Sequence, residues 1–179
     1  MSENCAQEAA VPPSAENLNA FWRNAVLAAR FNPAEAYMGQ SDLVSLRPPA
    51  FSFGDCAREA DRLCSLVLRG AKTAVSGYEP VYRAENVGLP RPGQLSILCD
   101  GGGLPRALLQ TREVRTVSFA QVTPEIAAAE GEPDLRQWIL DHEILFRKEC
   151  EGLGIDFSPS AAAVIEYFAV LYTAKGNKN

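Results

Sequence analysis

The sequence is short of histidine and of closely spaced cysteines. His142 is the single histidine among 179 residues, which excludes a multi-histidine metal centre. The five cysteines are odd in number and include no CxxC pair, so neither a structural zinc site nor a disulfide framework is expected. Cys64 and Cys150 fall on apolar faces of expected helices and should be buried thiols. The chemistry of a site is therefore expected from lysine, glutamate, serine, threonine, tyrosine and arginine.

Long apolar runs and a strong charge of one sign are missing as well. No run of eighteen apolar residues is present, so no membrane span is expected. The N-terminus lacks the basic and apolar regions of a secretory signal, and we therefore expect a cytoplasmic protein. Seventeen basic and twenty-two acidic residues give a net charge of −5, which excludes a histone-like polycation.

Basic side chains nevertheless gather in the middle of the chain. Residues 58–115 hold nine basic and six acidic residues, including Arg112 and Arg115. A net-acidic protein can still focus a positive field in one cleft. The same arginines could equally cover the solvent-exposed face of strands, and the sequence leaves both interpretations open.

Apolar spacing and capping signals predict four helices. The first follows Ser14 and stops before Asn32-Pro33, and the second runs from an Asp55 N-cap to a Gly70 C′ residue. A short third helix opens at Thr123-Pro124 and reaches Glu130. The fourth begins after Asp134 and ends near Gly152. Residues 32–53, rich in breakers, are expected to form a long surface connection.

Extended segments lie between these helices and at the end of the chain. They are residues 71–76, 81–84, 94–99, 107–119 and 163–172. Residues 100–103 read as a hairpin loop, and residues 107–119 as one long strand or two short ones. This order of elements predicts an α+β fold with a largely antiparallel sheet or a small barrel.

Several short motifs, in this order and spacing, resemble the ASCH domain, in particular its longer bacterial members. They are Phe53-Gly54-Asp55, Gly70-Ala71-Lys72-Thr73, Leu89-Pro90-Arg91-Pro92-Gly93, residues 128–132, the helix with Trp138, His142 and Phe146, and the final strand. The resemblance covers roughly residues 15–173. It implies a PUA-like, mostly antiparallel β-barrel at 51–173. From the residues themselves we expect a helix and a long connection at 14–50, and flexible tails at 1–13, which lacks periodicity and ends in Pro12-Pro13, and at 174–179.

The resemblance also implies a connection to RNA. Small ASCH hydrolases cleave the acetyl amide of N4-acetylcytidine with a lysine, a threonine three residues later and a glutamate. Carried onto this sequence, the lysine is Lys72 and the glutamate is Glu130, while the threonine position holds Val75. Thr73 and Ser76 flank that position and are the candidate hydroxyls. A lysine, a carboxylate and a hydroxyl suffice for amide hydrolysis, and equally for binding alone.

Aromatic and basic side chains near Lys72 are candidate binding residues. Tyr78 and Tyr82, beside Arg83 and Arg91, could stack on single-stranded bases, or the two rings could simply fill a lid over the sheet. Trp138 and His142 share a helix face and are expected to pack against the sheet.

We therefore expect recognition of RNA or of a modified, acetylated nucleoside in a pocket around Lys72, Thr73, Ser76 and Glu130, with amide hydrolysis as a further expectation. A ribonuclease acting on single-stranded RNA, helped by Mn²⁺ or Mg²⁺, is the first alternative. The second is a non-catalytic regulatory module for RNA. No other cofactor and no resident metal site are expected. All versions require Lys72 and Glu130 to meet in space.

Overall fold

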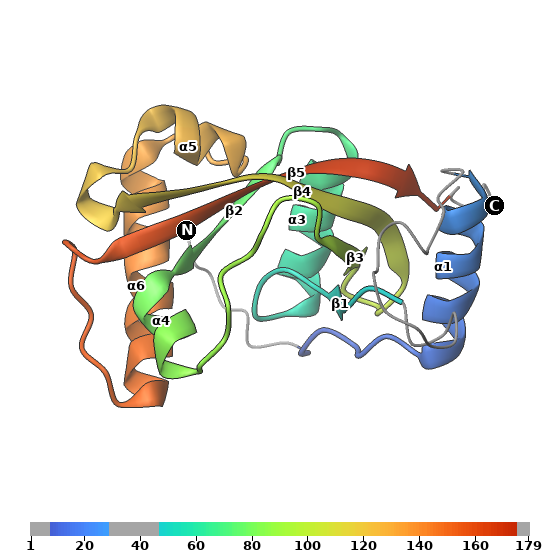
Figure 1. Ribbon diagram of the computed structural model, residues 1–179, viewed down its shortest axis with the longest axis horizontal. Helices are drawn as coiled ribbons and strands as arrows, with labels where there is room; N and C mark the ends of the chain where they lie inside the picture. The colour runs from blue at the N-terminus through green and yellow to red at the C-terminus, as the bar shows by residue number, and fades with distance from the viewer. Residues whose placement is uncertain (1–7, 29–46, 175–179) are drawn as a thin grey trace. The chain divides into compact units, whose positions relative to one another are not determined.

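A computed structural model describes residues 8–28 and 47–174 of the chain (Figure 1). Its elements are α1 (Ala15–Ala28), β1 (Ala50–Phe51), α3 (Ala57–Leu68), β2 (Ala74–Tyr78), α4 (Glu79–Ala84), β3 (Leu95–Cys99), β4 (Pro105–Ser118), the 3₁₀ helix η1 (Phe119–Gln121), α5 (Pro124–Ala129), α6 (Leu135–Leu153) and β5 (Ala162–Thr173). Helices and strands alternate irregularly, so the predicted α+β class is confirmed.

The strands form one mixed sheet in the order β1-β3-β4-β5-β2. β3 pairs with β4 and β2 with β5 in antiparallel fashion, whereas β1 runs parallel to β3. The order is linear, with β1 and β2 at its ends among the described strands. The expected closure into a barrel is therefore not confirmed, and the described strands form an open sheet.

Local capping signals explain where the helices begin and end. The Ser14 hydroxyl accepts from the Asn17 backbone N–H at 3.1 Å, and the Asp134 carboxylate accepts from Arg136 N–H at 2.9 Å, so both predicted N-caps are confirmed. Gly70 has φ +72°, the left-handed conformation predicted for the residue that ends α3. The expected end of the first helix near Asn32-Pro33 lies outside the described residues.

The predicted Asp55 N-cap is displaced by one residue, whereas the predicted end of the last helix near Gly152 is confirmed. The N-cap of α3 is Cys56, whose carbonyl accepts the first helical bond from Ala60 N–H at 2.9 Å. Asp55 still belongs to the bend that follows Gly54. At the other end of the fold, α6 continues to Leu153, because the left-handed residue that ends it is Gly154, with φ +67°.

Two segments differ from the predicted strands. Residues 81–84 are helical, because Pro80 stands in the first turn of α4 and cannot donate to a strand ladder. The two-residue strand β1 lies inside the predicted connection, where Ala50 pairs with Ile97 of β3. Residues 105–118 form one long strand, which settles the choice between one strand and two.

The chain divides into two compact units. Among the described residues, the first unit comprises residues 8–28, 47–69, 95–110 and 169–174. Its core joins one face of α1 to β3 and β4, and it is built from Leu18, Phe21, Trp22, Ala25, Leu95, Ile97, Cys99 and Leu108. Residues before α1, which were expected to belong to a flexible tail, are hydrogen-bonded here: Val11 N–H donates to Gly101 O and Glu8 O accepts from Ala57 N–H.

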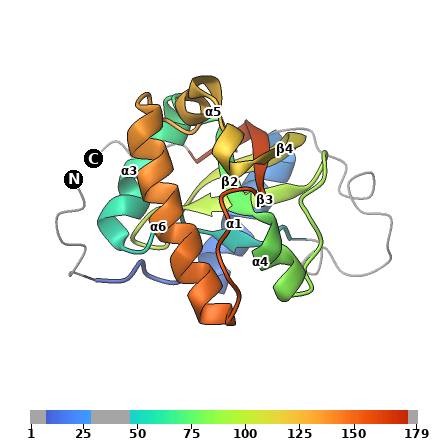
Figure 2. The same ribbon diagram turned by 90° about the vertical axis from the view of Figure 1, so that its left-hand side faces the viewer.

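The second unit comprises residues 70–94 and 111–168. Within it, α6 lies against both α4 and α5 (Figure 2). Aromatic rings dominate its core: Tyr78 stacks on Phe146 with ring centroids 5.0 Å apart, and Phe119 lies 5.9 Å from Trp138. This unit holds both residues that the sequence analysis required to meet.

The described cysteines differ in state. Cys64, Cys99 and Cys150 are free and buried, as expected for Cys64 and Cys150. Cys56, in contrast, is disulfide-bonded. The odd count and the spacing of the cysteines did not predict this bond. Within the described ranges, no helix combines the length and the apolar character that crossing a bilayer requires.

Candidate functional site

Backbone hydrogen bonds hold the segment that carries Lys72. The chain leaves α3 through the left-handed turn at Gly70 and then enters β2. Thr73 N–H donates to the carbonyl of Ala129 at 2.7 Å, and Thr73 O accepts from Phe168 N–H at 2.9 Å. The segment is thereby fixed between the end of α5 and β5, which places the Lys72 side chain beside Glu130.

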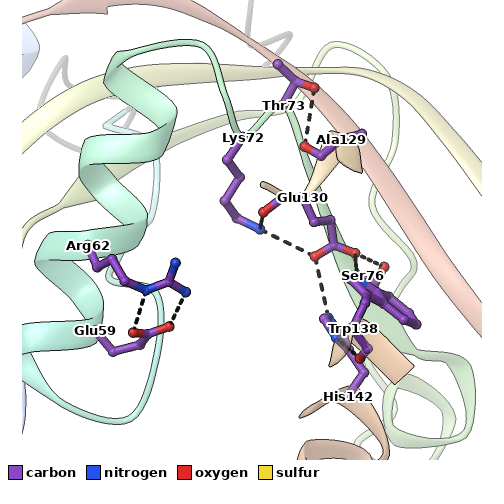
Figure 3. A network of polar contacts seen from close by, with 9 residues as sticks. All are labelled: Glu59, Arg62, Lys72, Thr73, Ser76, Ala129, Glu130, Trp138 and His142. Carbon is purple, nitrogen blue, oxygen red and sulfur yellow. Dashed lines mark hydrogen bonds and ion pairs between the residues drawn. The ribbon is translucent and has the colours of Figure 1, made fainter. Parts of the chain in front are cut away.

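Lys72 and Glu130, fifty-eight positions apart in the chain, lie together in the second unit (Figure 3). The ammonium Nζ lies 3.3 Å from the carboxylate Oε2 and 3.3 Å from the backbone carbonyl of Glu130. Only 4% of Lys72 and 5% of Glu130 is exposed. A buried charge is stable only with a partner, so each of these groups depends on the other.

Two neutral donors occupy the other carboxylate oxygen. The Ser76 hydroxyl donates to Oε1 of Glu130, and the indole Nε1 of Trp138 donates to the same oxygen at 3.1 Å. Ser76 reaches Glu130 because alternate residues of β2 face the interior. Val75 lies on the opposite face, where it pairs with Glu166 of β5.

His142 completes the set of contacts around Glu130. Its Nε2 lies 3.5 Å from Oε2, and its ring stacks on Trp138 with centroids 3.8 Å apart and planes inclined by 14°. Its Nδ1 lies 3.0 Å from the Trp138 backbone carbonyl. We call Lys72, Ser76, Glu130, Trp138 and His142 the Glu130 cluster.

The cluster keeps its carboxylate ionised. Burial alone would raise the pKa of Glu130, but the hydrogen bond from His142, the positive charge of Lys72 and the hydroxyl of Ser76 outweigh it, so the pKa is lowered from its usual 4.5. Among the residues described, every buried side-chain nitrogen and oxygen has a hydrogen-bond partner. The Glu130 carboxylate can therefore act as a proton acceptor. It already holds the Ser76 hydroxyl on one oxygen and the Lys72 ammonium on the other.

Sequence reasoning missed the roles of Trp138 and His142. Both were expected to pack against the sheet, and Trp138 does lie in the core. Their spacing of four residues correctly placed them on one helix face, but nothing in the sequence indicated that this face meets the end of α5. The Trp138 indole and the His142 imidazole each contact a different oxygen of Glu130.

Thr73, the other candidate hydroxyl, points elsewhere. Its side chain is exposed, and its Oγ1 donates to the Ala129 carbonyl at 3.4 Å rather than to the Glu130 carboxylate (Figure 3). Of the two hydroxyls that flank Val75, the structure therefore brings only Ser76 to the carboxylate.

Tyr78 cannot serve as a stacking platform, which corrects the expectation for this residue. Only 1% of Tyr78 is exposed, and its ring is enclosed by Phe146 and Phe157. Its hydroxyl donates to Ser158 O and accepts from Ser158 N–H, both at 2.9 Å. Tyr78 therefore belongs to the core of the second unit.

The remaining candidate binding residues lie outside the Glu130 cluster. The Tyr82 ring covers Gly77, where an added Cβ would lie 2.5 Å from the Tyr82 hydroxyl. Burial, reinforced by Glu166, raises the pKa of Tyr82. Arg83 is exposed and pairs with Glu79 at 2.6 Å, and Arg91 is exposed on the connection before β3.

Metal ligands are not grouped in the described part of the chain. Across residues 8–28 and 47–174, no three or more histidine, cysteine, aspartate or glutamate side chains are placed to hold a metal ion together.

Comparisons with known proteins agree with the fold. The ASCH domain model matches residues 49–172. Protein EF3133 from Enterococcus faecalis V583 has a similar crystal structure, with a TM-score of 0.75 and 28% identity over 88% of this chain and 89% of that one. An ASCH domain from Lactobacillus crispatus JV V101 gives a TM-score of 0.74 and 27% identity over 88% of this chain and 95% of its own. Among curated proteins, none matches. The chain belongs to the ASCH domain family.

Proposed function

We propose that this protein binds RNA or a modified nucleoside at the Glu130 cluster and hydrolyses an acetyl amide of the kind found in N4-acetylcytidine. Membership of the ASCH family, which is linked to RNA binding, supports the first part. One observation carries the second: the Ser76 hydroxyl donates to the Glu130 carboxylate, and the Lys72 ammonium lies on the same carboxylate. A nucleophile hydrogen-bonded to its base is the arrangement that acyl transfer requires.

The proposed reaction assigns a role to each of three groups. Ser76 Oγ attacks the acetyl carbonyl carbon while Glu130 takes the hydroxyl proton, and the Lys72 ammonium stabilises the negative charge that develops on the carbonyl oxygen. The tetrahedral intermediate breaks its C–N bond, and the departing amine takes the proton from Glu130. Water then cleaves the acetyl–serine ester by the same route, releasing acetate and restoring the hydroxyl.

The burial of the three groups favours a small acyl substituent as the part that reaches them. Ser76 is 8% exposed, and Lys72 and Glu130 are less so. An acetyl group needs far less room beside these groups than a phosphodiester backbone does. The nucleoside amide is therefore preferred to cleavage of an RNA strand.

Incubation with N4-acetylcytidine, followed by chromatographic detection of cytidine, tests the proposal. We expect S76A and E130Q to lower the rate by about 10²–10⁴-fold, and K72A to lower it as well. The matched control is S118A, which removes an exposed hydroxyl that donates to Pro159 O, and it should keep the wild-type rate. Retention of activity in S76A, or its loss in T73V instead, would overturn the assignment of the hydroxyl.

The same preparations distinguish the alternatives. Degradation of labelled single-stranded RNA that increases with manganese would favour a ribonuclease. Retention of RNA that weakens as salt rises, without release of cytidine or cleavage of RNA, would favour a non-catalytic module, because neutralised phosphates release counterions.

A further inference from the structure

The chain's single imidazole lies between two hydrogen-bond acceptors. His142 Nδ1 lies 3.0 Å from the Trp138 carbonyl, and Nε2 lies 3.5 Å from Oε2 of Glu130. A backbone carbonyl and a carboxylate oxygen can only accept, so each ring nitrogen makes a hydrogen bond here only when it carries a proton. Both contacts are hydrogen bonds only in the doubly protonated ring, and a neutral ring can keep one of them.

The contact between His142 and Glu130 therefore depends on the protonation of the ring. In the neutral ring with Nδ1–H, the Nε2 lone pair faces a carboxylate oxygen, and two acceptors repel each other. In the doubly protonated ring, Nε2–H donates to Oε2 and adds a positive charge beside that of Lys72. Gain or loss of one proton thus changes the number of cations on Glu130.

The position of His142 suits a group that exchanges protons with solvent. Its side chain is 17% exposed, against 5% for Lys72 and 4% for Glu130. The stack on Trp138 and the Nδ1 contact hold the plane of the ring, so Nε2 stays directed at Oε2. The ring also meets the edge of Phe146 at 5.6 Å. The charged groups that face it are Glu130, at the end of α5, and Lys72 across the same oxygen.

We propose that His142 is a titrating positioning residue for Glu130. Doubly protonated, it shares Oε2 with Lys72 and weakens Glu130 as a base. On losing one proton it removes a positive charge from beside Oε2, and Glu130 becomes a stronger acceptor for the proton of Ser76. The acid–base strength of the cluster thereby follows the protonation of one histidine. Only the activity measurement below rests on the proposed function.

Nuclear magnetic resonance of the untagged protein tests the inference without a substrate. Since His142 is the only histidine, its imidazole ¹⁵N signals need no assignment by mutation. We expect the ring to pass from two protons to one as the pH rises. The Glu130 carboxyl ¹³C signal, identified by its loss in E130Q, should shift over the same pH range.

Two variants separate titration from structure. In H142Q the side-chain amide can still donate toward Oε2 but does not titrate, so the step in the Glu130 signal should vanish while the thermal unfolding midpoint stays close to that of wild type. The control E143Q removes one charge at the next residue, on a carboxylate that pairs with Arg147, and should keep the step. A Glu130 step that persists in H142Q, or an imidazole that keeps one protonation state while the Glu130 signal shifts, would overturn the inference.

The pH profile of cytidine release gives an independent measurement. We expect the wild-type rate to rise as His142 loses its proton, and we expect H142Q to lack that rise. An identical profile in H142Q would contradict the role of His142. If the wild-type protein releases no cytidine at any pH, the proposed function fails, and the resonance titration alone decides the role of His142.

Discussion

The two units bury different kinds of side chain. Among the described residues, the buried polar or charged ones are Lys72, Ser76, Thr111 and Glu130, and all four lie in the second unit. The core of the first unit is built from apolar side chains. Burying a polar group lowers stability unless a partner compensates it. The second unit therefore carries a buried polar arrangement that stability alone does not require, and this is the arrangement on which the proposed function depends.

The largest effect should follow from neutralising Glu130. The E130Q variant leaves the Lys72 ammonium buried beside a neutral amide, and removing one partner of a buried pair costs about 3–5 kcal/mol. Urea unfolding should show this loss. The exposed pair Glu143–Arg147 supplies the control, because E143Q should cost at most about 1 kcal/mol. Equal stabilities of the two variants would remove the contrast between buried and exposed pairs.

A cavity in the first unit should weaken the fold without touching the site. Leu108 is fully buried in β4, so L108A should lower the free energy of unfolding by about 2–5 kcal/mol. Nucleoside binding, measured by calorimetry at a temperature where the variant is folded, should be unchanged. Weaker nucleoside binding in folded L108A would show that packing in the first unit does affect the Glu130 cluster in the second.

Acid should affect the second unit through Glu130. Because its pKa is lowered from the usual 4.5, the carboxylate contributes stability at pH values above 4.5, and this contribution is lost as the pH falls through the lower pKa of the folded state. Wild type should therefore lose more stability on acidification below pH 4.5 than E130Q does. Unfolding in urea across a pH series measures the difference, and parallel curves would contradict it.

The smallest effect concerns the thiols of the first unit. Burial raises the pKa of Cys64 to about 11 and that of Cys99 to about 11. Only about a thousandth of each thiol is then ionised at pH 8, and the thiolate is the reactive form. Mass spectrometry should find both cysteines unmodified after iodoacetamide treatment of the folded protein and modified after treatment in urea. Rapid modification of the folded protein would show that these groups are not inert.

Local signals in the sequence predicted most helices and strands, whereas long-range contacts explain the errors. Ser14, Gly70 and Asp134 act within one turn of a helix, so their effects can be read from neighbouring residues. The strand β1 exists only because it pairs with β3, forty-seven positions away. Closure of a sheet likewise depends on which distant edges meet, and the predicted barrel was not confirmed for that reason.

The candidate site was predictable in part. The family resemblance selected Lys72 and Glu130, but choosing between the flanking hydroxyls required the strand register that turns Ser76 toward the carboxylate. The contribution of His142 required knowing what α6 packs against. Periodicity identifies which residues share a face, and it does not identify what that face contacts.

The alternation along β2 has a consequence for how this sequence can vary. Removing or adding one residue between Lys72 and Ser76 would turn a different side chain toward Glu130. A deletion at Val75, for example, would move each preceding side chain of the strand to the opposite face of the sheet. Chain length in this short stretch is therefore more constrained than residue identity. Alignments that open a gap here would pair positions on opposite faces of the sheet, and such gaps are best moved elsewhere.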